Sequence, residues 1–273
     1  MIRIEEENDW LLLSHPDHAA LAGEFARHWK NDFFAPPKPF THILDATARH
    51  DDSWKERDEL PLLTPEMNPG AFSEELVGTY DAFEEIDLHD YLGVRGQATE
   101  AAALRDPYAA ILISMHTVNL LTVQADLSTL NDEDRAFHQA FIDGQLNRQE
   151  ELKARLSLQP DIAPYLTDEA FQAGFKFLQA CDSFSLYVGV AFSKPGKLQH
   201  AHPRRDGSET EIEFLPQGDH HYVLSPYPLD EPVVKFKVPY RRVAKSATAS
   251  LEEFQAAYSA APVEIVTVTV SQN

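Results

Sequence analysis

Apolar residues recur at helical spacing along most of the first 190 residues. Near the start, positions i, i+4, i+7 and i+11 of one stripe are His18, Ala22, Phe25 and Trp29. Capping residues and first-turn prolines mark where several helices begin. The pattern predicts helices over residues 16–30, 41–51, 73–92, 107–125 and 131–156, and another from residue 167 onward.

Strand-like patterns occupy both ends of the chain. Residues 1–5 and 10–14 predict a hairpin that turns at 7–9. Beyond residue 193, β-rich segments at 211–214, 222–224, 233–243 and 263–270 surround a short helix at 251–260. We therefore expect a mainly α-helical bundle in residues 1–192, carrying a small antiparallel sheet built from the extension 193–273 and the N-terminal hairpin.

The charge of the chain narrows the classes of partner. Asp and Glu number 44 against 23 Lys and Arg, which gives a net charge of −21. Such a surface repels nucleic acid and anionic lipid, although solubility alone also explains it. The single Cys181 excludes an intrachain disulfide and fits a reducing compartment. No signal peptide or membrane-spanning run is evident, so we expect a cytoplasmic protein. The sequence leaves its oligomeric state open.

Polar residues stand on the apolar stripes of three predicted helices. His18 lies on the first stripe, and Asp182 follows Phe175 and Leu178 on another. The His50-Asp51 dyad ends a helix whose periodicity turns both side chains toward the interior. A buried carboxylate is costly unless a cation compensates it. Each histidine alone could be a hydrogen-bonded core residue, but together these four predict a metal site.

The donor set indicates which metal and which neighbours to expect. Mixed imidazole and carboxylate ligands suit a divalent Mn, Fe, Zn or Mg ion. His116 lies in the apolar run ILISMHTVNLL and is a candidate catalytic residue, a ligand of a second metal or a core residue. Asp52 is a candidate to orient a ligand histidine. His15 and Trp54 are candidates for substrate binding, with a core role open for Trp54.

A rival histidine cluster lies near the C-terminus. His200 and His202 alternate as on one face of a strand, and His220-His221 follows. The surrounding QHAHPRRDG segment has the composition of an exposed loop, so the role of these four histidines stays open.

The order His18, His50-Asp51 and a distant Asp182 resembles the HD superfamily of metal-dependent phosphohydrolases. The chain also resembles the uncharacterised domain of unknown function 3891, a group that looks HD-derived. The stretches that carry this resemblance are SHPDHAALAGEFARHW, ARHDDSW, DPYAAILISMH and LQACDSFSLYVG. The resemblance implies an HD-domain-like fold, but no established activity comes with the family.

We therefore expect a metal-dependent hydrolase of HD type that acts on a small phosphorylated metabolite or nucleotide through a metal-activated water. His116 would stabilise developing charge or protonate the leaving group. The loop 52–72 and the C-terminal strands would form the walls of the substrate pocket. Two alternatives stay open: a di-iron HD-type oxygenase, and a non-catalytic metal- or ligand-binding protein.

Overall fold

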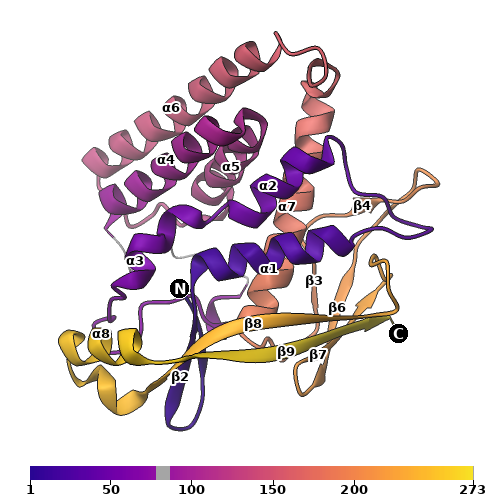
Figure 1. Cartoon of the computed structure of the whole chain (residues 1–273). Coiled ribbons are helices and arrows are strands. Elements are labelled where there is room, and N and C mark those ends of the chain that lie inside the picture. The colour runs from indigo at the N-terminus through magenta and orange to yellow at the C-terminus, as the bar shows by residue number, and fades with distance from the viewer. Residues whose placement is uncertain (78–86, 273) are drawn as a thin grey trace.

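The computed structural model describes residues 1–77 and 87–272 and combines helices with one large sheet (Figure 1). The α-helices are α1 (His15–His28), α2 (Phe40–Arg49), α3 (Lys55–Glu59), α4 (Leu88–Arg105), α5 (Pro107–Asn119), α6 (Asp132–Leu156), α7 (Asp168–Gly189) and α8 (Leu251–Ala260). A π-helical turn, Leu120–Gln124, continues α5. Short 3-10 turns lie at Asp52–Trp54, Glu74–Leu76, Ala163–Tyr165 and Lys245–Ala249.

The main sheet joins both ends of the chain. Its strands are β1 (Ile2–Glu5), β2 (Asp9–Leu13), β3 (Gly196–Lys197), β6 (Glu213–Gly218), β7 (His221–Ser225), β8 (Val233–Ala244) and β9 (Val263–Gln272), in the spatial order β1-β2-β8-β9-β7-β6-β3. The hairpin predicted at the N-terminus is present as β1 and β2, and β2 pairs with β8. Strands β4 (His202–Pro203) and β5 (Glu209–Thr210) form a separate pair.

The predicted mainly α, HD-domain-like bundle with a small antiparallel sheet is wrong. About 52% of the structure is helical and 21% is strand, and the main sheet has seven strands. The sheet is curled, and it is mixed because β7 and β9 run parallel while its other pairs are antiparallel. The long β8 and β9 bury one face under helices, so the sheet is a main layer of the fold. The division into residues 1–192 and 193–273 stays a prediction.

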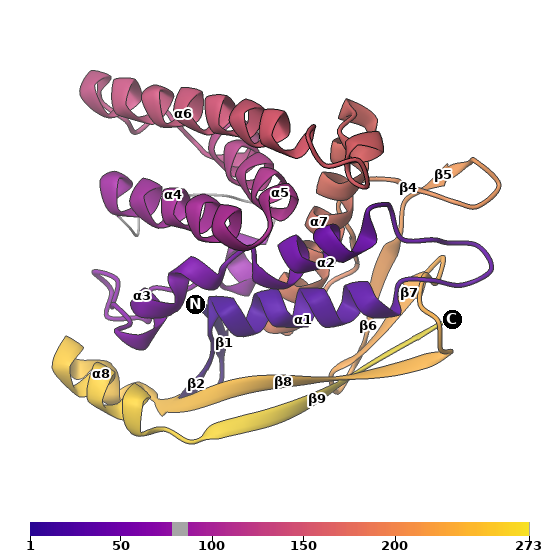
Figure 2. The same cartoon turned by 45° about the horizontal axis from the view of Figure 1, so that its top comes forward.

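Helices α1 and α7 connect the sheet to the outer helices (Figures 1 and 2). Phe25 of α1 stacks on Phe184 of α7 with ring centroids 3.8 Å apart, and Phe184 contacts Phe236 of β8 at 5.5 Å. Each aromatic side chain removes a large apolar area from water, which stabilises the contact between helices and sheet. Helices α4, α5 and α6 lie on the side of the molecule away from the sheet.

The crossing of α1 and α2 is unusually close. A Cβ atom added at Gly23 would lie 2.4 Å from the Cβ of Ala48, so position 23 has no space for any other side chain. His18 lies five residues before this contact, and His50 lies two residues after it. The close approach therefore holds the segments that carry these two histidines side by side.

One of the predicted helices lies partly outside the described residues. Residues 78–86 of the helix predicted over 73–92 lie outside the described part of the chain, and α4 begins at Leu88. Within residues 1–77 and 87–272, no helix combines the length and apolar character needed to cross a membrane.

Candidate metal centre

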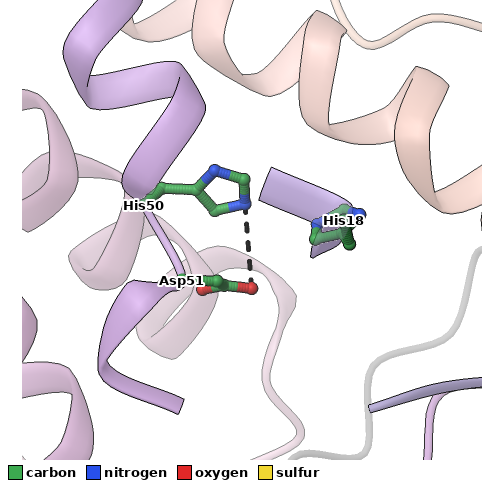
Figure 3. A group of neighbouring side chains, drawn as sticks. All are labelled: His18, His50 and Asp51. Carbon is green, nitrogen blue, oxygen red and sulfur yellow. Dashed lines mark ion pairs between the residues drawn. The ribbon is translucent and has the colours of Figure 1, made fainter. Parts of the chain in front are cut away.

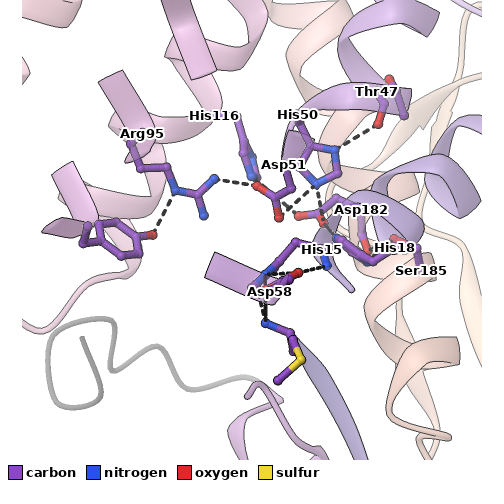
Figure 4. Close-up of polar contacts among 12 residues, drawn as sticks. His15, His18, Thr47, His50, Asp51, Asp58, Arg95, His116, Asp182 and Ser185 are labelled. Carbon is purple, nitrogen blue, oxygen red and sulfur yellow. Dashed lines mark hydrogen bonds and ion pairs between the residues drawn. The ribbon is translucent and has the colours of Figure 1, made fainter. Parts of the chain in front are cut away.

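Four separate helical segments bring their polar side chains to one buried point. His18 projects from α1, His50 follows the last residue of α2, His116 projects from α5, and Asp182 projects from α7 (Figure 4). All four side chains are at least nine-tenths buried. The Asp182 carboxylate is the common neighbour, with its oxygens 2.9 Å from His18 Nε2, 3.2 Å from His50 Nε2 and 3.8 Å from His116 Nε2.

Asp51 provides the second carboxylate of the cluster. Its Oδ2 lies 3.7 Å from His50 Nε2, and Figure 3 shows His18, His50 and Asp51 facing one another. Two groups of three have ligand atoms within 4.8 Å of each other: His18 with His50 and Asp51, and His50 with His116 and Asp182. His50 belongs to both groups.

Hydrogen bonds fix the orientation of two of the imidazoles. His50 donates its Nδ1–H to the Thr47 carbonyl oxygen at 2.9 Å. The Ser185 hydroxyl donates to the Asp182 carbonyl oxygen, so it accepts the Nδ1–H of His18 at 2.9 Å. In the neutral tautomers of both rings, Nε2 therefore carries a lone pair that faces the Asp182 carboxylate. Lone pairs and an anionic oxygen at this separation repel each other unless a cation or protons lie between them.

Because the side chains of the cluster are buried, its carboxylates need a compensating positive charge. His50 Nε2 and His116 Nδ1 are buried nitrogens with no hydrogen-bond partner among the described residues. Burial disfavours protonation of His50, but Asp51 and Asp182 outweigh it and raise its pKa to about 9. Burial would raise the pKa of Asp182, yet His50 and His18 hold that pKa well below its usual range. The two carboxylates are therefore ionised, and the cluster attracts cations.

The spacing of the donors matches a single small ion. Ligand atoms bound at about 2.1 Å lie about 3.0 to 3.4 Å apart in octahedral or tetrahedral geometry. All four pairs given above lie within half an ångström of this range. Because His50 Nδ1 is already committed to Thr47, only its Nε2 can bind metal, and the two groups of three describe one centre with a shared ligand.

Arg95 of α4 holds the outer side of the Asp51 carboxylate. Its Nη1 donates to Asp51 Oδ1 at 2.7 Å, and its Nε donates to the Tyr91 hydroxyl at 3.2 Å. The guanidinium also lies over the rings of Trp54 and Tyr91, 5.3 and 5.2 Å from their centroids. Burial opposes ionisation of Asp51, but Arg95 and the histidines keep its pKa well below the ordinary value.

The centre lies in the wall of a cavity of about 670 Å³. The cluster contributes His18, Asp51, His116 and Asp182 to this wall, and Arg95 also reaches it. Apolar side chains and amides form most of the rest. A cavity of this size accommodates a small molecule, so a bound ion would keep a coordination position open toward it.

Comparison with known proteins identifies the family. The model of the family described as "Protein of unknown function (DUF3891)" matches residues 1–245. The chain belongs to the DUF3891 family. No curated protein and no solved structure matches this DUF3891 chain. None of these comparisons supports the resemblance to the HD superfamily.

Three other predicted site residues of the DUF3891 protein lie around the cluster. His15 lines the cavity, packs on Trp54 at 5.0 Å, and has Nδ1 within 3.0 Å of Asp58 Oδ1 and 2.8 Å of the Met1 amino group. Trp54 also lines the cavity and is buried. Asp52 starts the turn after α2 and pairs with Arg49 at 3.3 Å, rather than with a ligand histidine.

The four C-terminal histidines do not converge. His202 is buried and donates to the Gln199 carbonyl oxygen, while His200 donates to Gln179 at 2.6 Å. His221 lies 2.9 Å from the Ser271 hydroxyl, across the parallel pair β7 and β9. Within the described part of this DUF3891 chain, none of them joins a group with metal-ligand spacing.

Sequence reasoning missed Arg95, Thr47 and Ser185. A signal for Arg95 was present in the sequence. Helical spacing places this basic residue on a buried stripe together with Tyr91, Ala98 and Ala102, and basic residues are scarce in this chain. Helical spacing places Thr47 on the face of His50 and Ser185 on the stripe of Asp182, but this spacing does not indicate that they accept hydrogen bonds from His50 and His18. Their role depends on which ring nitrogen of a neighbouring histidine faces them.

The raised pKa of His50 predicts how metal affinity depends on pH. Below about pH 9 an incoming ion must displace a proton from His50, whereas His116, with a pKa lowered to about 4 mainly by burial, is already neutral at pH 7. We expect affinity for Mn²⁺ to rise about tenfold per pH unit between pH 6.5 and 8.5. Titration calorimetry in buffers of different ionisation enthalpy would measure the released proton. An affinity that does not change over this range would contradict the assignment of His50 as a ligand.

Proposed function

We propose that this protein is a metal-dependent hydrolase that acts on a small phosphorylated metabolite or nucleotide through a metal-activated water. The observation that carries the proposal is the fixed orientation of His18 and His50, whose Nε2 atoms both face the buried Asp182 carboxylate at the wall of a cavity. A divalent ion bound there supplies a water whose pKa falls toward neutrality, which makes hydroxide available as a nucleophile.

The charges along the cavity support an anionic substrate. Among the described residues, the charged side chains of its wall, apart from histidines, are the carboxylates of Asp51 and Asp182 and the guanidinium of Arg95. With His50 protonated behind them, these groups have no net charge. A divalent ion that displaces the His50 proton leaves an excess of one positive charge, so an anion such as a phosphate ester is attracted once the ion is bound.

His116 has a role suited to its protonation state. Its pKa is lowered to about 4, chiefly by burial, so its imidazole is neutral at pH 7. A neutral imidazole can ligate the ion or donate a hydrogen bond to charge that develops on the substrate. It is a poor general acid at this pH. Arg95 lies where it would orient the same anionic group, while Trp54 packs against its guanidinium.

The alternatives receive less support. A di-iron oxygenase needs more ligands, and the nearest further histidine, His15, is engaged with Asp58 and the Met1 amino group. A structural metal site is usually closed by four protein ligands and buried away from solvent. The centre in this protein opens on a cavity instead, which favours turnover of a bound molecule.

The test combines metal analysis with an assay. Protein purified without chelator should contain about one equivalent of a divalent metal and should release phosphate from p-nitrophenyl phosphate or from a panel of phosphorylated metabolites. His50→Gln should lose the metal and the activity, because His50 Nε2 is the donor that both groups of three share. His138→Gln is the matched control, since His138 is a buried histidine on α6 that bonds the Leu121 carbonyl oxygen away from the cavity.

Three results would refute the proposal. They are wild-type protein that binds no divalent metal, metal-loaded protein that hydrolyses none of the panel, and equal loss of activity in the His50 and His138 variants.

A further inference from the structure

A group of amide side chains lies on the cavity wall beside the metal centre. It consists of Asn119, Gln124 and Gln179, with His200 at its edge, and all four line the cavity. We call it the amide cluster. Neither the ion nor the attack of a water requires these residues, so the cluster calls for a separate explanation.

The amide cluster lies one helical turn from the metal ligands. Asn119 follows His116 by three residues on α5, and Gln179 precedes Asp182 by three residues on α7. Residues three apart on a helix share a face and lie about 5 Å from one another. Gln179 Nε2 donates to Asn119 Oδ1 at 2.8 Å and joins the two helices. A small molecule held at the ion therefore extends onto this cluster.

Hydrogen bonds fix the orientation of the amides. His200 Nε2 donates to Gln179 Oε1, and Asn119 Oδ1 accepts from Gln179 and from Gln124 Nε2, the latter at 3.1 Å. The π-helical turn Leu120–Gln124 places residue 124 above residue 119, and such turns are frequent at functional sites. Among the described residues, both N–H groups of the Asn119 amide and the carbonyl oxygen of Gln124 have no protein partner. They remain available to a ligand.

The surroundings of the amide cluster determine what kind of group it accepts. The apolar side chains of Leu120 and Val123, from the same π-helical turn as Gln124, also line the cavity. Arg95, which among the described residues is the cationic non-histidine side chain of the wall, pairs with Asp51 at the metal centre instead. The cluster therefore offers donors and an acceptor without net charge, between apolar surfaces. A neutral planar heterocycle with an amide-like edge satisfies all of these groups at once.

We propose that the amide cluster is a subsite for the nucleobase of a nucleotide whose phosphate lies at the metal centre. The identification of the phosphate position rests on the proposed hydrolase function, whereas the subsite itself rests on the amide geometry. Asn119 donates to a base carbonyl or ring nitrogen, and Gln124 accepts from a base N–H. Gln179 and His200 position Asn119 and do not contact the base.

The test uses nucleosides, because they bind the subsite without offering a phosphate to hydrolyse. Titration calorimetry of the full chain with adenosine, guanosine, cytidine and uridine should show binding of at least one, and ribose should not bind. Asn119→Ala and, independently, Gln124→Ala should weaken that binding about tenfold, the effect of one to two lost hydrogen bonds. Gln139→Ala removes an exposed amide from α6 that bonds Asp143, and it should leave binding unchanged.

The outcomes separate this inference from the proposed function. If no nucleoside binds, or if both variants bind as tightly as wild type, the subsite is refuted even where phosphate esters are hydrolysed. Equal binding of ribose and nucleosides also refutes it, because recognition of the sugar then explains the affinity. Binding that depends on Asn119 in a protein that hydrolyses no phosphate ester keeps the subsite and refutes the hydrolase. Circular dichroism and metal content of each variant establish that it is folded.

Discussion

Asp182→Asn is expected to abolish metal binding and any activity that depends on it. The carboxylate of Asp182 lies 2.9, 3.2 and 3.8 Å from the Nε2 atoms of His18, His50 and His116, and it provides one of the two negative charges that attract a cation. Asparagine preserves the shape but removes the charge. Residues that merely orient ligands contribute about 10- to 100-fold to metal affinity, so loss of this ligand should exceed about 100-fold.

The measurement is a Mn²⁺ or Zn²⁺ titration with elemental analysis of the purified variant. Asp230→Asn serves as the matched control, because Asp230 also pairs with a histidine, His28 at 2.8 Å, but on the surface. Retention of stoichiometric metal by the Asp182 variant would show that this carboxylate is a structural hydrogen-bond partner and not a ligand.

Arg95→Met is expected to destabilise the metal-free protein strongly. The Arg95 and Asp51 side chains are 7% and 8% exposed, and removing one partner of a buried ion pair costs about 3 to 5 kcal/mol. Methionine retains most of the volume between Trp54 and Tyr91, so the loss reports the uncompensated charge of Asp51. In a chain of this size the loss corresponds to a decrease in Tm of about 10 °C.

Thermal unfolding with and without Mn²⁺ tests this expectation. A bound cation also compensates Asp51, so metal should recover part of the lost stability. Arg105→Met removes the partner of Asp45 at the surface and should change Tm little, because exposed pairs contribute at most about 1 kcal/mol. A decrease in Tm that metal leaves unchanged would separate Asp51 from the metal centre.

The sequence indicated which polar side chains the structure brings together, but it did not predict the fold. Helical periodicity fixes which residues share a face, so His18 and Asp182 could be placed on buried stripes from local pattern alone. The structure brings them to 2.9 Å from each other. The polar character of these residues on apolar stripes was the signal, because a buried carboxylate demands a partner.

The sheet was harder to predict, because alternation along a strand does not identify its neighbour. The segments at 222–224 and 263–270 were recognised as strands, but their parallel pairing as β7 and β9 depends on contacts between distant residues. Helix α4 extends to Arg105, although Gly93 and Gly96 weaken the helical signal in its interior. Asp58, which binds His15 and the Met1 amino group, lies in a segment that lacks periodicity.

The absence of a side chain at Gly23 has a consequence for selectivity among ions. With α1 and α2 in backbone contact there, the histidine nitrogens they carry have little freedom to move apart. In the proposed metal centre, such a rigid cage of donors would discriminate by ionic radius: bonds of about 2.1 Å would be accommodated, whereas Ca²⁺, which needs about 2.3 to 2.6 Å and more oxygen atoms, would be rejected. A single missing methyl group would thus help to determine which divalent ion the proposed centre selects.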